Sequence, residues 1–190
     1  MSAERTRARI LDAARRAFAR GGFEATSVRS IAALAGVDQA LVHHYFGTKR
    51  QLFLEAIEVP MDPAELLAPV LAAPREQMGE AYLRAVLGLW DSEAEPALVS
   101  TLRTLVSSPD GQAVIGSFVL EVALRALEPA VDDGSGSARL RLSLVASQTV
   151  GLILARKVAR IEPIASMAAD DLAALVAPTI QRYMTGELPG

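Results

Sequence analysis

The chain has no cysteine and only two histidines among its 190 residues. The lack of cysteine excludes disulfides, thiolate metal sites and a cysteine nucleophile. Motifs of zinc proteases, serine hydrolases, P-loop proteins and dinucleotide-binding enzymes are also absent. We therefore expect no catalytic residues, no metal site and no cofactor, and an α-helical enzyme is the least favoured alternative.

Long uncharged apolar runs are lacking as well. Residues 1–18, MSAERTRARILDAARRAF, carry charges throughout and contain no continuous apolar core. No apolar segment elsewhere reaches the length of a membrane-spanning helix without a charge. These two absences predict a cytoplasmic protein with no signal peptide and no contact with a membrane.

Positive charge is scarce overall, since the net charge is −3, but it is concentrated at one end. Residues 1–55 contain nine lysines and arginines against five acidic residues, and the rest of the chain contains ten against seventeen. A basic region followed by an acidic one is typical of a protein in which only one end meets phosphate. A chance fluctuation of composition is the alternative, so charge alone does not identify a DNA-binding protein.

Helical periodicity runs almost from end to end, and no alternating strand pattern interrupts it. The first pattern covers residues 5–20 and ends at Gly21 and Gly22. Prolines between residues 60 and 74 indicate a linker. Further helical runs are expected at 75–91, 94–107, 109–128, 138–161 and 168–185. The predicted fold is all-α, with about nine to ten helices in two domains, 1–58 and 59–190.

Residues 26–53 read TSVRSIAALAGVDQALVHHYFGTKRQLF and form three short helical patterns. Thr26, Asp38 and Thr48 each stand where a helix N-cap is preferred, the last in a capping box. Gly36 supplies the positive φ that a sharp turn between the first two patterns requires. A supporting helix, a glycine turn and a second helix are typical of a helix–turn–helix, which presents its second helix to the DNA major groove.

The second helix of this motif has an inward and an outward face. Val42 and Phe46, four residues apart, point to the core. On the outward face, Gln39 can make a bidentate contact with an adenine edge, and His43 lies one turn further on. The predicted DNA-binding residues of the whole motif are Thr26, Ser27, Arg29, Gln39, Ala40, Leu41, His43, Tyr45, Thr48 and Lys49.

Two kinds of DNA contact are expected from this set. Arg29, Gln39 and His43 would read base edges, although the arginine and the histidine can also reach phosphate. Tyr45 and the helix N-termini would bind phosphate, or Tyr45 would belong to the core. A metal-binding pair is a poor alternative, because His43 and His44 are adjacent and lie roughly 100° apart on a helix. A purely structural pair of helices is the remaining alternative.

A family resemblance rests on Phe23-x-x-Thr26, on Ile31-Ala32-x-x-Ala35-Gly36-Val37, and on Leu41 to Phe46 followed by Gly47-Thr48-Lys49. With these residues, the region 5–57 resembles the TetR family of transcriptional regulators. Two positions depart from the family pattern. His43 stands where the family commonly has a tyrosine that contacts phosphate or base, and Gly47 stands where it often has lysine.

The resemblance implies a C-terminal domain that holds a small-molecule pocket and pairs through its last two helices. Residues 140–161 are apolar on more than one face and contain small residues, and residues 168–184 repeat apolar residues at helical spacing. A helix that needs burial on two faces predicts a partner surface. We expect a homodimer that spaces two recognition helices about 34 Å apart. Core helices of a monomer are the alternative.

The effector pocket is identified only loosely. Pockets are lined by large apolar residues with a few polar anchors, and so are ordinary cores. The candidate ligand-binding residues are Met78, Tyr82, Trp90, Leu102, Phe118 and Gln148. The low charge of these segments favours an apolar or amphipathic effector.

Together these features predict a ligand-responsive, sequence-specific DNA-binding regulator. We expect a repressor that binds a palindromic double-stranded DNA operator as a dimer and is released by a small molecule, with residues 58–74 conveying the change. A DNA-binding regulator without a small-molecule ligand is the alternative.

Overall fold

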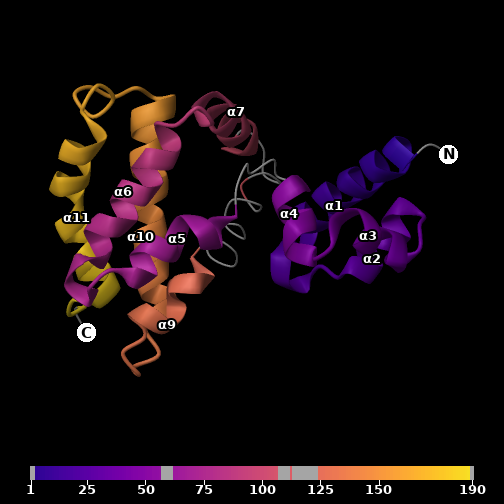
Figure 1. Cartoon of the computed structure of the whole chain (residues 1–190), viewed down its shortest axis with the longest axis horizontal. Helices are drawn as coiled ribbons and strands as arrows, with labels where there is room; N and C mark the ends of the chain where they lie inside the picture. The colour runs from indigo at the N-terminus through magenta and orange to yellow at the C-terminus, as the bar shows by residue number, and fades with distance from the viewer. Residues whose placement is uncertain (1–2, 57–61, 107–111, 113–123, 189–190) are drawn as a thin grey trace. The chain divides into compact units, whose positions relative to one another are not determined.

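The computed structural model describes residues 3–56, 62–106, 112 and 124–188. These residues are helical almost throughout and contain no strand (Figure 1). The all-α prediction is therefore confirmed. The chain divides into two compact units. One comprises Met1–Asp62 with Thr101–Val122, and the other comprises Pro63–Ser100 with Ala123–Gly190.

Four helices make up most of the N-terminal unit: α1 (Ala3–Ala25), α2 (Val28–Ala35), α3 (Gln39–Phe46) and α4 (Lys49–Ala56). The break predicted at Gly21 and Gly22 is present, because Gly22, with φ +68° and ψ −179°, is not helical and two helical segments meet there in a kink. Helices α2 and α4 both pack against α1. The N-terminal unit is thus assembled around one long helix.

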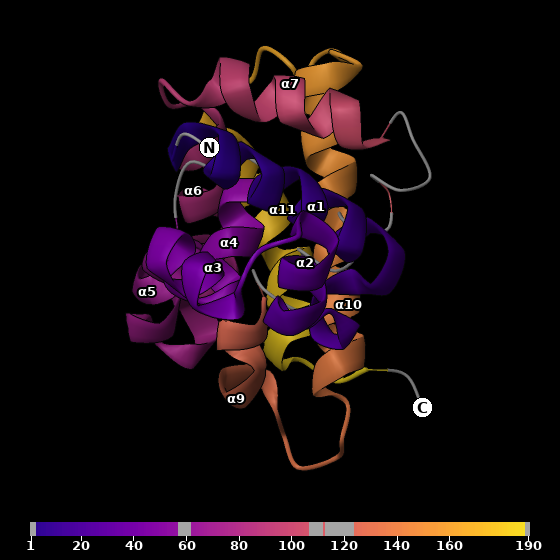
Figure 2. The ribbon, with the colours of Figure 1, turned by 90° about the vertical axis from the view of Figure 1, so that its right-hand side faces the viewer.

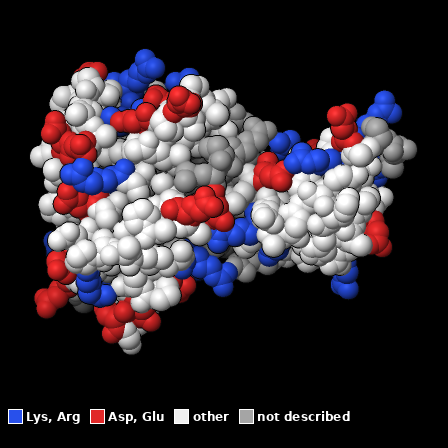
Figure 3. All heavy atoms as spheres, in the orientation of Figure 1, with Lys and Arg blue, Asp and Glu red and all other residues white. Residues whose placement is uncertain are grey.

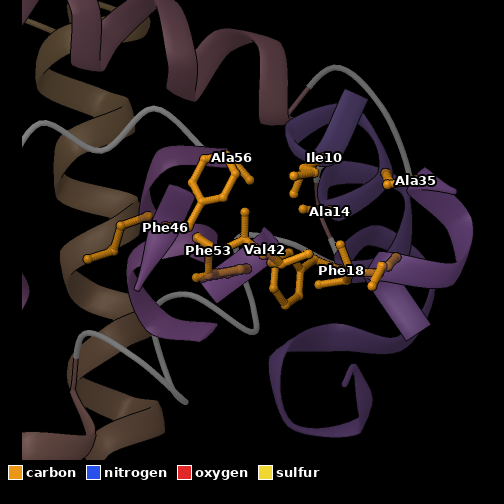
Figure 4. Close-up of a cluster of buried hydrophobic side chains, with 14 residues drawn as sticks. Ile10, Ala14, Phe18, Ala35, Val42, Phe46, Phe53 and Ala56 are labelled. Atoms are coloured by element: carbon orange, nitrogen blue, oxygen red, sulfur yellow. The ribbon is translucent and has the colours of Figure 1, made fainter. Parts of the chain in front are cut away.

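Aromatic rings fill the centre of this unit (Figure 4). Phe18 and Phe53 are fully buried and meet edge to face with ring centroids 4.7 Å apart. The ring of Phe23 lies 5.1 Å from that of Phe53. Burial of each ring contributes on the order of 2–3 kcal/mol of hydrophobic stabilisation. The short helices of the unit are therefore held by their shared core.

The C-terminal unit is built mainly from longer helices. They are α5 (Pro63–Ala72), α6 (Met78–Trp90), the start of α7 (Glu95–Val106), α9 (Glu128–Val131), α10 (Ala138–Ile153) and α11 (Ala169–Thr185). Helix α6 packs against α5 and α11, and α10 packs against α9 and α11 (Figure 1); Figure 2 shows the same helices in a view turned by 90°. Two short turns, η1 (Arg75–Gln77) and η3 (Arg125–Leu127), precede α6 and α9. Most of the predicted helix 109–128 lies outside the described residues.

Helices α6 and α11 approach most closely at Gly79. A Cβ atom there would stand 2.6 Å from the backbone nitrogen of Gln181 and 2.9 Å from the carbonyl oxygen of Ala177. Both ends of the Gln181 side-chain amide form hydrogen bonds at this contact. Its oxygen accepts the Gly79 N–H at 2.7 Å, and its nitrogen donates to the Arg75 carbonyl at 2.8 Å. One α11 side chain thereby satisfies backbone groups at the start of α6.

A buried arginine joins α10 to the end of α11. Arg141 is 5% exposed. Its guanidinium donates to the carbonyl oxygens of Tyr183 at 3.1 Å and Gly186 at 2.8 Å, and to the carboxylate of Asp133 at 2.8 Å. Hydrogen bonds from the Ser135 hydroxyl and the Ser135 backbone N–H, and then from Arg141, hold the pKa of Asp133 below its usual range. The loop before α10 and the carbonyls that end α11 are thus satisfied by one side chain.

The end of α10 departs from the predicted continuous helix. Residues Leu154–Val158 form a π-helical turn, η4. Within it, Arg156 donates to Asp91 at 2.9 Å, and Lys157 lies 2.7 Å from Asp91 and 2.9 Å from Glu95. The wider turn places two consecutive cations against the carboxylates at the end of α6 and the start of α7.

Candidate nucleic-acid interface

The turn between α2 and α3 has the geometry of a helix–turn–helix. Gly36 ends α2 in the left-handed conformation, with φ +63° and ψ +42°, and its N–H bonds back to Ala32 and Ala33. Asp38 then caps α3, because its carboxylate accepts the Ala40 N–H at 2.7 Å. Both the glycine turn and the Asp38 cap are as the sequence predicts.

The cap of α2 differs from the prediction by one residue. Ser27, not Thr26, is the N-cap, and it forms a reciprocal capping box with Ser30. Thr26 is buried, and its hydroxyl oxygen lies 2.7 Å from the Gly22 carbonyl oxygen. Both residues are good caps, but the Thr26 side chain is already bonded to the end of α1. Thr26 thus stabilises the junction of α1 and α2.

Helix α3 has the two faces expected from the sequence. Val42 and Phe46 are buried against the core. The outward positions Gln39, Ala40 and His43 are exposed, as is His44. The two remaining candidates on this helix, Leu41 and Tyr45, are half-buried, and Tyr45 packs against the core. The exposed face of α3 therefore presents a glutamine and two histidines beside one alanine.

The start of α4 carries the predicted capping box. The Thr48 N–H donates to the Gln51 side-chain oxygen at 2.9 Å, and the Gln51 N–H donates to the Thr48 hydroxyl at 3.1 Å. Lys49 follows, and its ammonium lies 4.3 Å from the centroid of the Phe23 ring. This cation–π contact directs the lysine along the aromatic core while its charge stays near the helix N-terminus.

Three arginines of α1 make contacts that hold the N-terminal unit together, which the sequence did not indicate. Arg9 donates to the Ala35 carbonyl at the end of α2, and Arg15 donates to the Ala56 carbonyl at the end of α4, at 2.8 Å. Arg7 lies over the Phe46 ring, 5.0 Å from its centroid. On the face shown in Figure 3, basic and acidic residues are interspersed over the N-terminal unit. Part of its positive charge therefore stabilises helix ends.

Two family models match this chain. Residues 10–56 match the model of the tetR family of bacterial regulatory proteins, and residues 76–184 match that of the tetracyclin repressor-like C-terminal domain. The chain belongs to the TetR family. Its resemblance to that family is thereby confirmed over both units and not over the helix–turn–helix alone. TetR members are transcription regulators, so family membership argues against the enzyme alternative.

Individual relatives agree with this assignment. The transcriptional repressor NicS of Pseudomonas putida is 33% identical over 107 residues, covering 54% of this chain and 49% of that protein. The regulator BetI of Rhizobium meliloti is 38% identical over 73 residues, 36% of each protein. The chain thus spans about a third to a half of the length of these curated relatives. A crystal structure of a TetR-family regulator from Streptomyces coelicolor A3 is 38% identical over 95% of each chain, with a TM-score of 0.45.

The candidate effector residues of this TetR-family chain lie in different settings. Met78 and Tyr82 are buried one turn apart on α6. Trp90, at the end of α6, is half-buried, and Gln148 is exposed on α10. Leu102, on α7, is half-buried and belongs to the N-terminal unit. Phe118 lies outside the described residues.

Of the two buried candidates on α6, Tyr82 has a polar group, and its hydroxyl is already hydrogen-bonded. The Tyr82 hydroxyl lies 3.1 Å from the Thr149 hydroxyl oxygen, and Thr149 in turn donates to the Val145 carbonyl at 2.8 Å. Tyr82 is therefore the donor of its pair. Burial raises the pKa of Tyr82 to about 12. The phenol stays neutral at physiological pH and offers a polar atom within an apolar interior.

Helices α10 and α11 both expose large apolar side chains. Leu140 is 56% exposed and Leu175 is 67% exposed. Of the described helices, only Ala138–Val158 is long and apolar enough to cross a membrane. In its most apolar 18-residue stretch, 33% of the residues are buried. The core helix of a soluble protein meets the same two criteria, so length and composition do not distinguish a membrane span from an interface.

Proposed function

We propose that this TetR-family protein is a sequence-specific transcriptional repressor that binds a palindromic operator as a homodimer and is released by a small molecule. The observation that carries the proposal is the exposed polar row on α3, presented by a glycine turn and by caps at both of its neighbours. It would act in the cytoplasm. Repression is supported by the role of one relative, the transcriptional repressor NicS.

DNA recognition would use the residues that α2, α3 and α4 leave accessible. Gln39 and Arg29 are exposed and have the donor and acceptor groups that read base edges. Ser27 and Thr48, at the starts of α2 and α4, would place backbone amides against phosphates. Ala40 and Leu41 would contact a thymine methyl group, and Tyr45 and Lys49 the backbone.

The second copy would pair through α10 and α11. Their exposed leucines and the low burial of α10 are what an isologous interface covers. Pairing would also double the DNA contacts, because two recognition helices then read adjacent turns of a palindrome. Dimerisation and operator binding are therefore two parts of one proposal.

Control by a small molecule would act through α6. Met78 and Tyr82 would contact an apolar or amphipathic effector, and the Tyr82 hydroxyl would exchange its bond to Thr149 for one to the ligand. Coupling requires that the effector bind one arrangement of the two units better than the other. One observation favours a regulator without a ligand: the buried hydroxyl pair is already satisfied within the chain.

The test is binding to operators selected from random DNA. Affinity is expected to fall steeply with salt, and Lys49→Ala is expected to lower the slope of log K against log salt by about one unit. Gln39→Ala is expected to cost about 1–3 kcal/mol and to relax the preference at one base pair. Fluorescence anisotropy across a salt series measures both effects.

Arg84→Ala is the matched control. It removes one exposed positive charge from α6, which is neither in the proposed DNA-binding face nor in the proposed dimer interface, and is expected to leave the salt slope unchanged. Failure to enrich any sequence from the random pool would refute the proposed function. An operator preference unchanged in Gln39→Ala would refute the role of that residue.

A further inference from the structure

We propose that His43 recognises no base itself and instead fixes which end of the Gln39 amide faces which part of the base edge. This inference rests on the proposed DNA-binding function and adds a positioning residue to it. It differs from the sequence-based expectation, in which His43 contacts DNA directly. The imidazole makes two hydrogen bonds, one to Gln39 on its own helix and one to Gly47 just after that helix.

The first bond determines the tautomer. The Nδ1 atom of His43 lies 2.8 Å from the carbonyl oxygen of Gly47, the C-cap of α3. A carbonyl oxygen only accepts hydrogen bonds, so Nδ1 must carry the proton. In the neutral ring the other nitrogen, Nε2, then has a lone pair and no hydrogen. The end of α3 therefore makes Nε2 an acceptor.

The second bond uses that acceptor. Nε2 of His43 lies 3.4 Å from Nε2 of Gln39, one helical turn earlier. With the ring in this tautomer, the glutamine amide is the donor of the pair. The two bonds are mutually consistent, because the hydrogen that Nδ1 gives to Gly47 is what frees Nε2 to accept from Gln39. At 3.4 Å the second bond is long, and its effect is to orient the amide more than to stabilise the helix.

The orientation matters because an amide is polar from end to end. A glutamine amide has two N–H groups and one oxygen, and one N–H is used by His43. The second N–H and the oxygen remain available, in a fixed order along the groove. Adenine presents an acceptor, N7, and a donor, the N6 amino group, also in a fixed order. Rotating the amide by 180° exchanges its two ends and opposes like groups, which removes both bonds.

Direct reading by His43 would conflict with this arrangement. A base contact or a phosphate contact from the ring would require it to leave either Gly47 or Gln39, since both nitrogens are engaged. Leaving Gly47 would also give up the hydrogen bond to the carbonyl that follows α3. The two internal bonds thus assign His43 to the support of Gln39.

Two substitutions separate the bonds. His43→Gln places an amide oxygen near the position of Nε2, so it retains an acceptor for Gln39 and loses the bond to Gly47. His43→Asn places an amide N–H near the position of Nδ1, so it retains the bond to Gly47 and loses the acceptor. A purely structural role for His43 predicts that the asparagine variant resembles the wild type more closely than the glutamine variant does.

The experiment measures discrimination at one base pair. Selection with the wild type and with Gln39→Ala identifies the position that Gln39 reads, and anisotropy then gives the affinity ratio between adenine and the other bases there. His43→Asn is expected to lower this ratio about five- to tenfold, the equivalent of one hydrogen bond. His43→Gln is expected to keep it within about twofold. In the Gln39→Ala background, His43→Asn is expected to change the ratio no further.

Three results would overturn the inference. They are an unchanged ratio in His43→Asn, an equal loss in His43→Gln, and a further loss when His43→Asn is combined with Gln39→Ala, which would mean that His43 contacts DNA itself. Circular dichroism melts of each variant check that α3 remains folded. A wild-type protein that selects no sequence would instead refute the proposed function, whereas intact wild-type specificity with an unaffected His43→Asn refutes this inference alone.

Discussion

In the N-terminal unit, the starts of the short helices are capped by residues close in sequence, whereas in the C-terminal unit the start of α6 is bonded by a residue far away. Ser27 caps α2 with Ser30, and Asp38 caps α3 within its own first turn. In the C-terminal unit, the start of α6 is bonded by Gln181, 102 residues later. A local cap needs no second helix, while a distant one makes the start of α6 depend on its packing against α11.

Gly36 and Gly79 show the same contrast between a local requirement and a distant contact. Gly36 is required for its backbone conformation, since its φ is +63°, and a Cβ there would meet only the end of the flexible Arg9 side chain, at 3.0 Å. Gly79 has ordinary helical geometry but no free space, because the backbone of α11 stands within 3 Å of any added Cβ. One glycine serves a turn and the other serves a helix contact.

The largest expected effect is that of Gly79→Ala in the C-terminal unit. The new methyl group cannot be accommodated without separating α6 from α11, because backbone atoms do not move aside as side chains do. We expect a loss of about 3 kcal/mol in the free energy of unfolding. Urea denaturation followed by circular dichroism measures it.

Gly88→Ala is its control on the same helix. Nothing lies within 4 Å of a Cβ at that position. Alanine is there expected to stabilise the protein by about 0.5–1 kcal/mol, because glycine is a poor helix former. Equal effects of the two substitutions would contradict the role assigned to the α6–α11 contact.

An intermediate effect is expected from Arg141→Met. The substitution keeps an unbranched apolar stem, shorter than that of arginine, and leaves the carbonyls of Tyr183 and Gly186 without their donor. The expected cost is about 2 kcal/mol. Thermal unfolding of this variant is compared with that of Arg139→Met, an exposed arginine two residues earlier, for which a change within about 0.5 kcal/mol is expected. Similar melting temperatures for the two would show that the buried bonds add little.

The smallest effect is expected in the N-terminal unit, from Gly36→Ala. A left-handed alanine costs about 1–2 kcal/mol, while Arg9 can shift away from the new methyl group. Gly36→Asn is expected to cost less, because asparagine tolerates positive φ. The ranking is checked by chemical denaturation. A loss in Gly36→Ala as great as in Gly79→Ala would contradict the distinction between the two glycines.

The features that could be predicted from the sequence are the local ones. The Asp38 cap, the Thr48 capping box and the burial of Val42 and Phe46 all depend on spacings of two to four residues, and each is observed. The choice between Thr26 and Ser27 as cap was missed. Both residue types suit the position, and only the packing of Thr26 against the end of α1 decides between them.

Contacts of arginines were beyond the reach of sequence patterns. Arg9 and Arg15 have the helix spacing of surface residues, and their bonds to the carbonyls of Ala35 and Ala56 cross 26 and 41 residues. Arg141 lies in a run of apolar residues, which is a signal, because a charge at such a position must be bonded when it is buried. The effector residues were the least predictable, since pocket linings and cores share one composition.

The open surroundings of Gly88 also have a practical consequence. Because the chain contains no cysteine, a cysteine in place of this glycine would be the only thiol in the protein. A spin label attached there would lie on α6, outside the proposed pairing helices α10 and α11. A dimer would then carry two labels, one on each chain. The distance between the two labels, recorded with and without DNA, would then act as a molecular ruler for the motion of the paired chains.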